Sequence, residues 1–278
     1  MSEPFLKWAG GKRWLVSERP EWFRVEVTRH VEPFLGSGAV FFGIEPKMAM
    51  LSDLNAELIA TYLALRDFPT DVRRKLREHQ RLHNSEYYYR IRATICRTPV
   101  TRAARFIYLN RTCFNGLYRV NLQGKFNVPK GTKDAVLLPT DDFPALSNLL
   151  HKAELYARDF SETISEVGEG DFLYVDPPYT VRHNTNNFLK YNEQIFSWSD
   201  QQRLAEDLAL AAKRGAHILV SNADHPCIHG LYSSNVWARI SVPRFSKLAA
   251  SAQHRKATTE LIISNYLTEK GERKKLRD

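Results

Sequence analysis

The chain has 278 residues, of which 43% are hydrophobic and 26% are charged, so it can bury a sizeable core as one large domain or as one domain with an insertion. No apolar run is long enough to cross a bilayer and we expect no signal peptide. The three cysteines lack metal-ligand spacing, which predicts a cytoplasmic protein without a metal site, and the net charge of +9 indicates a polyanionic partner.

A glycine turn lies near the start of the chain. Gly10-Gly11-Lys12 predicts a tight turn that enters a helix, without the spacing of a phosphate-binding P-loop. Backbone amides at such a turn can hold a carboxylate, with Lys12 nearby as a cation.

A second glycine turn, Gly36-Ser37-Gly38, follows a predicted strand that begins at His30 and precedes an apolar helix start. Glycines there let the backbone pass close to a ligand, although an ordinary turn between strand and helix has the same pattern. Residues 48–53 predict another strand, which ends in Asp53. An acid at this place is suited to the two hydroxyls of a ribose, and a helix N-cap is its alternative role.

The pattern changes after the helix predicted near residues 58–65. Basic helical segments follow, and then a β-hairpin is predicted with its turn at Gln123-Gly124. Basic and amide side chains alternate with aromatic ones over residues 109–131, which suits phosphates and bases, although a solvated hairpin is the alternative. We therefore expect residues 1–56 and 145–270 to form a catalytic region, 57–144 an inserted recognition region and 271–278 a basic tail.

The last part of the chain alternates again between short apolar runs and helical patterns. Residues 155–158 predict a strand before Asp159, and residues 172–175 predict a buried strand of a parallel sheet. A helix with a capping box at residues 199–202 ends at Gly215. A further buried strand is expected at 217–222, and an antiparallel hairpin at 236–243 and 260–266.

Asp176-Pro177-Pro178-Tyr179 directly follows the strand predicted at 172–175. The prolines end the ladder and hold Asp176 and Tyr179 on a stiff turn past the sheet, where open α/β sheets place their chemistry. A flat ring with an exocyclic amine fits this turn, because the Asp176 carboxylate and the Pro177 carbonyl each accept one N–H while Tyr179 stacks on the ring. The amine lone pair then points out of the ring plane toward an electrophile. An ordinary turn with a surface tyrosine is the alternative.

Motifs in this order resemble those of the Dam-type DNA adenine-N6 methyltransferases. The matching stretches are residues 5–12, 32–38, 115–119 with 126–129, and 176–179. The resemblance implies an α/β fold: a Rossmann-like methyltransferase sheet with an antiparallel C-terminal hairpin, plus an inserted, mostly helical target-recognition region with a β-hairpin. It also implies S-adenosylmethionine as methyl donor, and methylation at N6 of an adenine that is flipped out of double-stranded DNA.

The resemblance assigns roles to individual residues by position. The cofactor-binding residues would be Trp8, Lys12, Phe34, Gly36, Ser37, Asp53, Asp159, Phe160 and Asp176. The catalytic residues around the target adenine would be Asp176, Pro177 and Tyr179. The DNA-binding residues, for recognition of GATC, would be Lys7, Phe114, Asn115, Leu117, Arg119, Asn121 and Pro129. The chain departs from the family pattern where Phe114 replaces a tyrosine and where residues 249–255 are not glycine-rich.

Three other classes of protein fit parts of the sequence. A nucleotide-dependent oxidoreductase is disfavoured because Phe41 stands where the third glycine is required. A non-catalytic DNA-binding module does not explain three acids at strand ends, since acids oppose phosphate binding. An RNA or protein methyltransferase shares the amine chemistry and stays open, with the hairpin favouring DNA. We expect a monomer, because no long apolar surface or heptad is visible.

Overall fold

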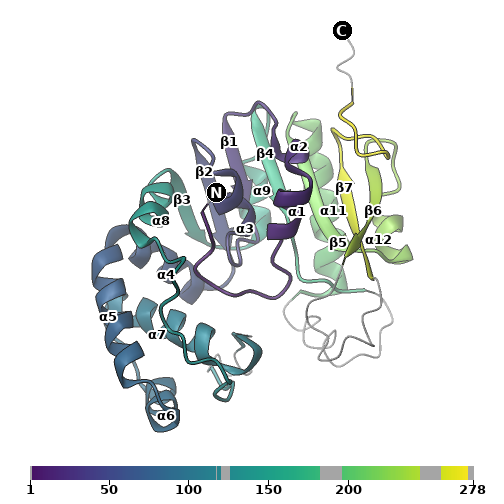
Figure 1. Ribbon diagram of the computed structural model, residues 1–278. Helices are drawn as coiled ribbons and strands as arrows, with labels where there is room; N and C mark the ends of the chain where they lie inside the picture. Colours follow the sequence, from purple (N-terminus) through teal and green to yellow (C-terminus); the bar gives the residue numbers. More distant parts are fainter. Residues whose placement is uncertain (1, 117, 120–125, 182–195, 245–257, 275–278) are drawn as a thin grey trace. The chain divides into compact units, whose positions relative to one another are not determined.

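The computed structural model describes residues 2–116, 118–119, 126–181, 196–244 and 258–274 (Figure 1). It contains a mixed sheet of seven strands. The chain forms two compact units, Met1–Phe23 with Leu35–Arg158 and Arg24–Phe34 with Asp159–Asp278. The predicted division into a catalytic and a recognition region is a functional one and stays a prediction.

The first unit is mostly helical, as expected for the middle of the chain (Figure 1). Strand β2 pairs in parallel with β3, with Ala49 opposite Ala153. The elements of this unit are α1 (Arg13–Glu18), α2 (Pro20–Phe23), α3 (Ala39–Ile44), β2 (Ala49–Asp53), α4 (Ala56–Asp67), α5 (Pro69–Leu82), α6 (Ser85–Ala93), α7 (Pro99–Thr112), the 3-10 turn η1 (Phe114–Gly116), α8 (Phe143–Leu150) and β3 (Ala153–Ala157).

The helices of the first unit bury apolar faces against one another. In α5 only Val72, Leu76 and His79 are buried, while its many basic side chains face outward or lie at the edge. Helix α7 packs against α4 and α5 and is buried over its whole second half. Helical spacing of apolar residues therefore decides which side of this basic region forms the core.

The second unit contains a sheet in the order β1-β4-β5-β7-β6. Strands β1, β4 and β5 are parallel, and β7 lies antiparallel between β5 and β6. Its elements are β1 (Arg29–Glu32), α9 (Phe160–Ser165), β4 (Asp171–Val175), α11 (Trp198–Lys213), β5 (His217–Ala223), α12 (Pro226–Leu231), β6 (Ala238–Arg244) and β7 (Thr258–Ser264). The α/β class and the antiparallel C-terminal hairpin are confirmed.

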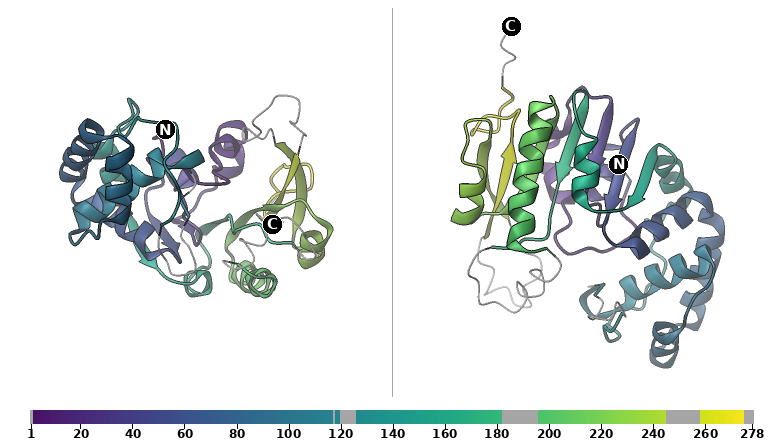
Figure 2. Two further views of the ribbon diagram at one scale, coloured as in Figure 1. Left: turned by 90° about the horizontal axis from the view of Figure 1, so that it is seen from below. Right: turned by 180° about the vertical axis from the view of Figure 1, so that it is seen from behind.

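Strand β4 is buried at all five positions, which explains why its sequence reads as a continuous apolar run after Asp171. Its backbone pairs in parallel with β1 on one side and with β5 on the other. Helices α9 and α11 lie side by side against one face of these strands (Figure 2). Asp176 and the residues after it thus leave the carboxyl end of a central strand.

The predicted start of α11 is wrong by two residues. Its N-cap is Ser197, which accepts a bond from the Asp200 amide at 3.2 Å, while the Asp200 carboxylate accepts the Ser197 amide at 2.8 Å. The box at residues 199–202 was expected because Gln is a common third residue of such boxes, but the shorter Asp200 closes the box here. Gly215, with φ +95°, follows the end of the helix as predicted.

Two further expectations lie outside the described residues. They are the hairpin turn at Gln123-Gly124 and the segment 249–255. None of the described helices is both long enough and apolar enough to cross a membrane.

Candidate active site

In the first unit, the side chains of Trp8 and Asp53 both contact the backbone of the second glycine turn at Gly36. Gly36 has φ +49°, and a Cβ added to it would lie 2.8 Å from Cδ1 of the Trp8 indole. The Gly36 amide donates to Oδ2 of Asp53 at 3.0 Å. Only glycine therefore lets the indole lie against this turn while the turn is tied to the end of β2.

Asp53 is not the helix cap that its alternative reading suggested, because Asn55 caps α4. Its Oδ1 accepts the Asn55 amide at 2.9 Å. Burial raises the pKa of Asp53, and the hydrogen bonds from the two amides oppose this shift. Each carboxylate oxygen has a second lone pair, so Asp53 can accept further hydrogen bonds from hydroxyl groups.

Lys12 lies at the first glycine turn, where it is the N-cap residue of α1. Although it is a lysine, only 2% of its surface is exposed, and its Nζ donates to the Gly10 carbonyl at 2.6 Å. The Cβ position of Gly11 lies 3.7 Å from Oγ of Ser37. The two glycine turns are therefore neighbours, and they bring a buried cation and a buried hydroxyl to one place.

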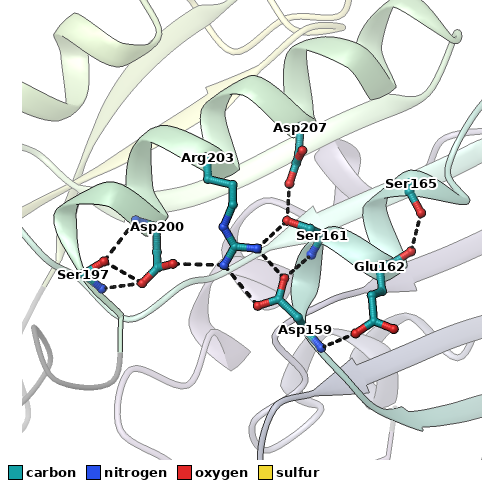
Figure 3. A network of polar contacts seen from close by, with 8 residues as sticks. All are labelled: Asp159, Ser161, Glu162, Ser165, Ser197, Asp200, Arg203 and Asp207. Carbon is teal, nitrogen blue, oxygen red and sulfur yellow. Dashed lines mark hydrogen bonds and ion pairs between the residues drawn. The ribbon is translucent and has the colours of Figure 1, made fainter.

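In the second unit, three aromatic rings pack around the start of α9. Phe34 stacks on Phe160 at 5.3 Å between ring centroids, and Phe196 contacts both rings. Asp159 caps α9 and forms an ion pair with Arg203 (Figure 3). The hydrogen bond from Arg203 lowers the pKa of Asp159, so this carboxylate is ionised at neutral pH.

The turn after β4 is anchored through the hydroxyl of Tyr179. This hydroxyl donates to Oε1 of Glu260 at 2.5 Å and lies 3.2 Å from Oγ of Ser221, which also donates to Glu260. Glu260 is 1% exposed, whereas Tyr179 is half-buried. Burial, together with Asp176 and Glu260, raises the pKa of the phenol well above its usual value, so it remains a donor.

The segment after α7 presents several of the predicted DNA-binding side chains. The Phe114 amide donates to the Pro129 carbonyl at 2.9 Å, and the Phe114 ring is 54% exposed. Asn115 has φ +56°, and Arg119 and Pro129 are exposed. Leu117 and Asn121 lie outside the described residues.

Comparison with known proteins identifies the family. A model of the D12 class N6 adenine-specific DNA methyltransferases matches residues 8–247. The chain is 34% identical to the type II methyltransferase M1.LlaDCHI of Lactococcus lactis subsp. cremoris, over 95% of each chain.

The chain belongs to the D12 class of N6 adenine-specific DNA methyltransferases. It is also 35% identical to the DNA adenine methylase of Serratia marcescens, over 79% of this chain and 83% of that one. With the type II methyltransferase M.MjaIII of Methanocaldococcus jannaschii it shares 33% identity, over 95% of this chain and 99% of that one. The predicted Dam-type methyltransferase and its adenine-specific activity are thereby confirmed.

In this methyltransferase, the sequence did not predict the two residues that form hydrogen bonds with the Tyr179 hydroxyl. Ser221 lies on β5 and Glu260 on β7, 42 and 81 positions from Tyr179. The available signal was an acid at the start of an apolar strand, Glu260 before Leu261, which is unusual for a buried position. Among the described residues, no group of three or more acidic, histidine or cysteine side chains is placed to hold a metal ion.

Lys7 of the methyltransferase is fixed to helix α7 by a pair of hydrogen bonds. Its amide donates to Oδ1 of the buried Asn110 at 2.9 Å, and Asn110 Nδ2 donates to the Lys7 carbonyl at 2.7 Å. Burial, together with the nearby Lys133 and Arg111, lowers the pKa of Lys7 to about 8. Lys7 is thus an ammonium that titrates close to physiological pH.

If Lys7 contacts DNA, as the family resemblance implies, this pKa predicts that the contact depends on pH. Phosphate or guanine acceptors favour the charged ammonium, so DNA raises the pKa of Lys7, and binding takes up a proton between pH 8 and the higher pKa of the complex. DNA affinity should therefore fall as pH rises above 8, measured by fluorescence anisotropy at constant ionic strength. Lys7→Arg, which stays charged, should remove this dependence, and a persisting slope in that variant would contradict the assignment.

Proposed function

We propose that the protein transfers a methyl group from S-adenosylmethionine to N6 of an adenine flipped out of double-stranded GATC. The observation that carries the proposal is the motif Asp176-Pro177-Pro178-Tyr179 at the end of the fully buried strand β4. Tyr179 is fixed there by Glu260 and Ser221. We expect the enzyme to act as a monomer in the cytoplasm, associated with the nucleoid through its DNA substrate.

The residues present fit S-adenosylmethionine. Asp53 has acceptor capacity for the ribose hydroxyls. Phe160, which stacks on Phe34, would form an apolar wall beside the adenine. Asp159 is an ionised acceptor for the adenine amine. The glycine-lined turn would leave room for the methionine part, with Trp8, Lys12, Gly36 and Ser37 beside it. We propose Asp176 as a further cofactor-binding residue. The cofactor supplies an electrophilic methyl group.

The chain's own residues would hold the target amine for attack. The Asp176 carboxylate and the Pro177 carbonyl each accept one N–H of the amine, which leaves the nitrogen lone pair out of the ring plane. The bond to Asp176 strengthens as positive charge develops on nitrogen. Stacking on Tyr179, worth about 1–3 kcal/mol, offsets part of the few kcal/mol that extrusion of the base costs.

GATC is supported by the residues that match GATC-specific relatives. Lys7 would contact the first guanine and Phe114 would enter the base stack, with Asn115, Leu117, Arg119, Asn121 and Pro129 at the target bases. The exposed ring of Phe114 and the exposed Arg119 suit these roles. An arginine that donates twice to guanine is the commonest specific contact to a base edge.

Replacing Arg119 with alanine should relax the preference at one guanine-containing pair. Loss of a bidentate contact costs about 1–3 kcal/mol of discrimination, so a substituted duplex should be methylated about 5- to 150-fold better relative to GATC than by the parent enzyme. Methylation rates on single-substitution duplexes measure this. The exposed Arg81 on α5 provides a control, because Arg81→Ala should leave relative rates unchanged. Unaltered discrimination in Arg119→Ala would remove Arg119 from the recognition set.

The direct test is transfer of a labelled methyl group to unmethylated duplexes with and without GATC. Label on the GATC duplex alone is the expected result, and digestion to nucleosides should yield N6-methyladenosine. Label on both duplexes would keep the chemistry and reject GATC. Label on neither, with RNA or protein labelled instead, would reject DNA as the substrate.

A further inference from the structure

Arg203 on α11 joins a polar network that includes residues proposed to bind the cofactor (Figure 3). Its Nη1 donates to Oδ1 of Asp159 at 2.6 Å and to Oγ of Ser161 at 2.7 Å. Its Nη2 donates to Oδ2 of Asp159 at 3.1 Å and to Oδ1 of Asp200 at 2.9 Å. The paired contacts with Asp159 are bidentate, so they fix the plane of the carboxylate as well as its position.

Arg203 itself is held by the capped ends of two neighbouring helices. Asp200 is the third residue of the capping box of α11, and Asp159 is the N-cap of α9. The hydroxyl of Ser161 donates to Asp207 at 2.5 Å, which leaves its lone pairs for Arg203. A guanidinium with acceptors on several sides loses little further freedom when a ligand arrives.

The same guanidinium lies over the aromatic ring that follows Asp159. Its central carbon is 4.1 Å from the ring centroid of Phe160, within the range of a cation–π contact. Phe160 in turn stacks on Phe34. One side chain therefore constrains both the acid and the ring of the pair Asp159-Phe160.

We propose that Arg203 is a positioning residue for the cofactor, which orients the Asp159 carboxylate to accept a hydrogen bond from the 6-amino group of the cofactor adenine. This inference rests on the proposed function, in which Asp159 and Phe160 hold that adenine. Asp159 Oδ1 accepts bonds from both Arg203 and the Ser161 amide, and Oδ2 accepts one from Arg203; the capping box of α9 also directs the Glu162 amide at this carboxylate.

The test compares two ligands that differ at the 6-position of the purine. S-adenosylhomocysteine carries an amine there, and S-inosylhomocysteine carries a carbonyl oxygen, which cannot donate to a carboxylate. Isothermal titration calorimetry should show that the parent enzyme binds the adenosyl ligand about 10- to 100-fold more tightly, since a hydrogen bond to a charged group is lost. In Arg203→Gln this ratio should fall severalfold, mainly through weaker binding of the adenosyl ligand.

Arg203→Lys separates orientation from charge. Lysine keeps the positive charge but cannot form the bidentate pair, so the ratio should stay low in this variant. A full return of the parent ratio with lysine would overturn the proposal, as would an unchanged ratio in Arg203→Gln.

Arg214 provides a matched control at the other end of the same helix pair. It follows α11 and donates to the Val167 and Ile164 carbonyls at 2.6 and 2.7 Å, so Arg214→Gln loosens α9 and α11 without touching Asp159. Thermal stability should fall in this variant while the ligand ratio is kept. An equal loss of ratio would assign the effect to helix packing and reject Arg203 as a positioning residue.

The parent enzyme also distinguishes failure of this inference from failure of the proposed function. If the parent binds neither ligand, S-adenosylmethionine is rejected as cofactor and the inference falls with it. If the parent binds both ligands equally, the cofactor proposal stands and recognition of the 6-amino group is rejected.

Discussion

Asp176→Ala is expected to lower the rate of methyl transfer steeply while cofactor binding is kept in part. In the proposed mechanism the substitution removes the acceptor for the amine N–H, whose bond strengthens as charge develops in the transition state. Removal of one such oriented group costs about 10²–10³ in kcat in comparable sites. Single-turnover methylation measures the loss, and titration with S-adenosylhomocysteine should show a dissociation constant within about tenfold of the parent value.

Two further variants show whether this loss is chemical. Asp176→Asn keeps an acceptor oxygen but not the negative charge, so its rate should lie between those of the parent and Asp176→Ala. Asp171→Asn, at the other end of β4, weakens a bidentate pair with Arg29, formed at 2.9 Å, and should lower stability without changing kcat. If Asp176→Ala turned over as fast as the parent enzyme, the assignment of this motif to catalysis would be rejected.

Asp53 and Asp176 were predictable as acids at strand ends because each follows an apolar run in the sequence. Burial makes β4 continuously apolar, and the prolines after it mark where the ladder stops, so Asp176 is visible from local pattern alone. The residues that hold Tyr179 and Asp159 in place were not predictable. Glu260 and Arg203 reach Tyr179 and Asp159 across 81 and 44 positions, and only the packing of the strands and helices brings them there.

The amino-acid composition of residues 109–131 also could not distinguish an arginine buried in the fold from an exposed arginine that could contact DNA. Arg111 and Arg119 lie eight positions apart in the same basic and aromatic stretch. Arg119 is exposed, whereas Arg111 is 2% exposed. Its helix, α7, is buried over its second half, which a mixed pattern of charged and apolar residues does not reveal.

Arg111→Met should destabilise the fold by about 3–5 kcal/mol, a large part of the roughly 5–15 kcal/mol that holds a domain together. Arg111 donates to both carboxylate oxygens of Asp141 at 2.6 Å, and to the carbonyls of Phe5 and Val136. The Asp141 side chain is only 5% exposed. Methionine fills the space but leaves this carboxylate buried without its cation. Urea unfolding followed by circular dichroism measures the change.

A double variant separates the ion pair from simple loss of packing. In Arg111→Met combined with Asp141→Leu no buried charge is stranded, so much of the lost stability should return, as replacement of buried ion pairs by apolar groups is often neutral. Arg66→Met removes a partly exposed pair with Asp67 and should change stability by no more than about 1 kcal/mol. Because Arg111 also binds the Phe5 carbonyl, the double variant should still weaken the hold on the N-terminal segment that carries Lys7 and Trp8. A double variant as unstable as Arg111→Met would place the main contribution of Arg111 in its bonds to the Phe5 and Val136 carbonyls, not in the ion pair.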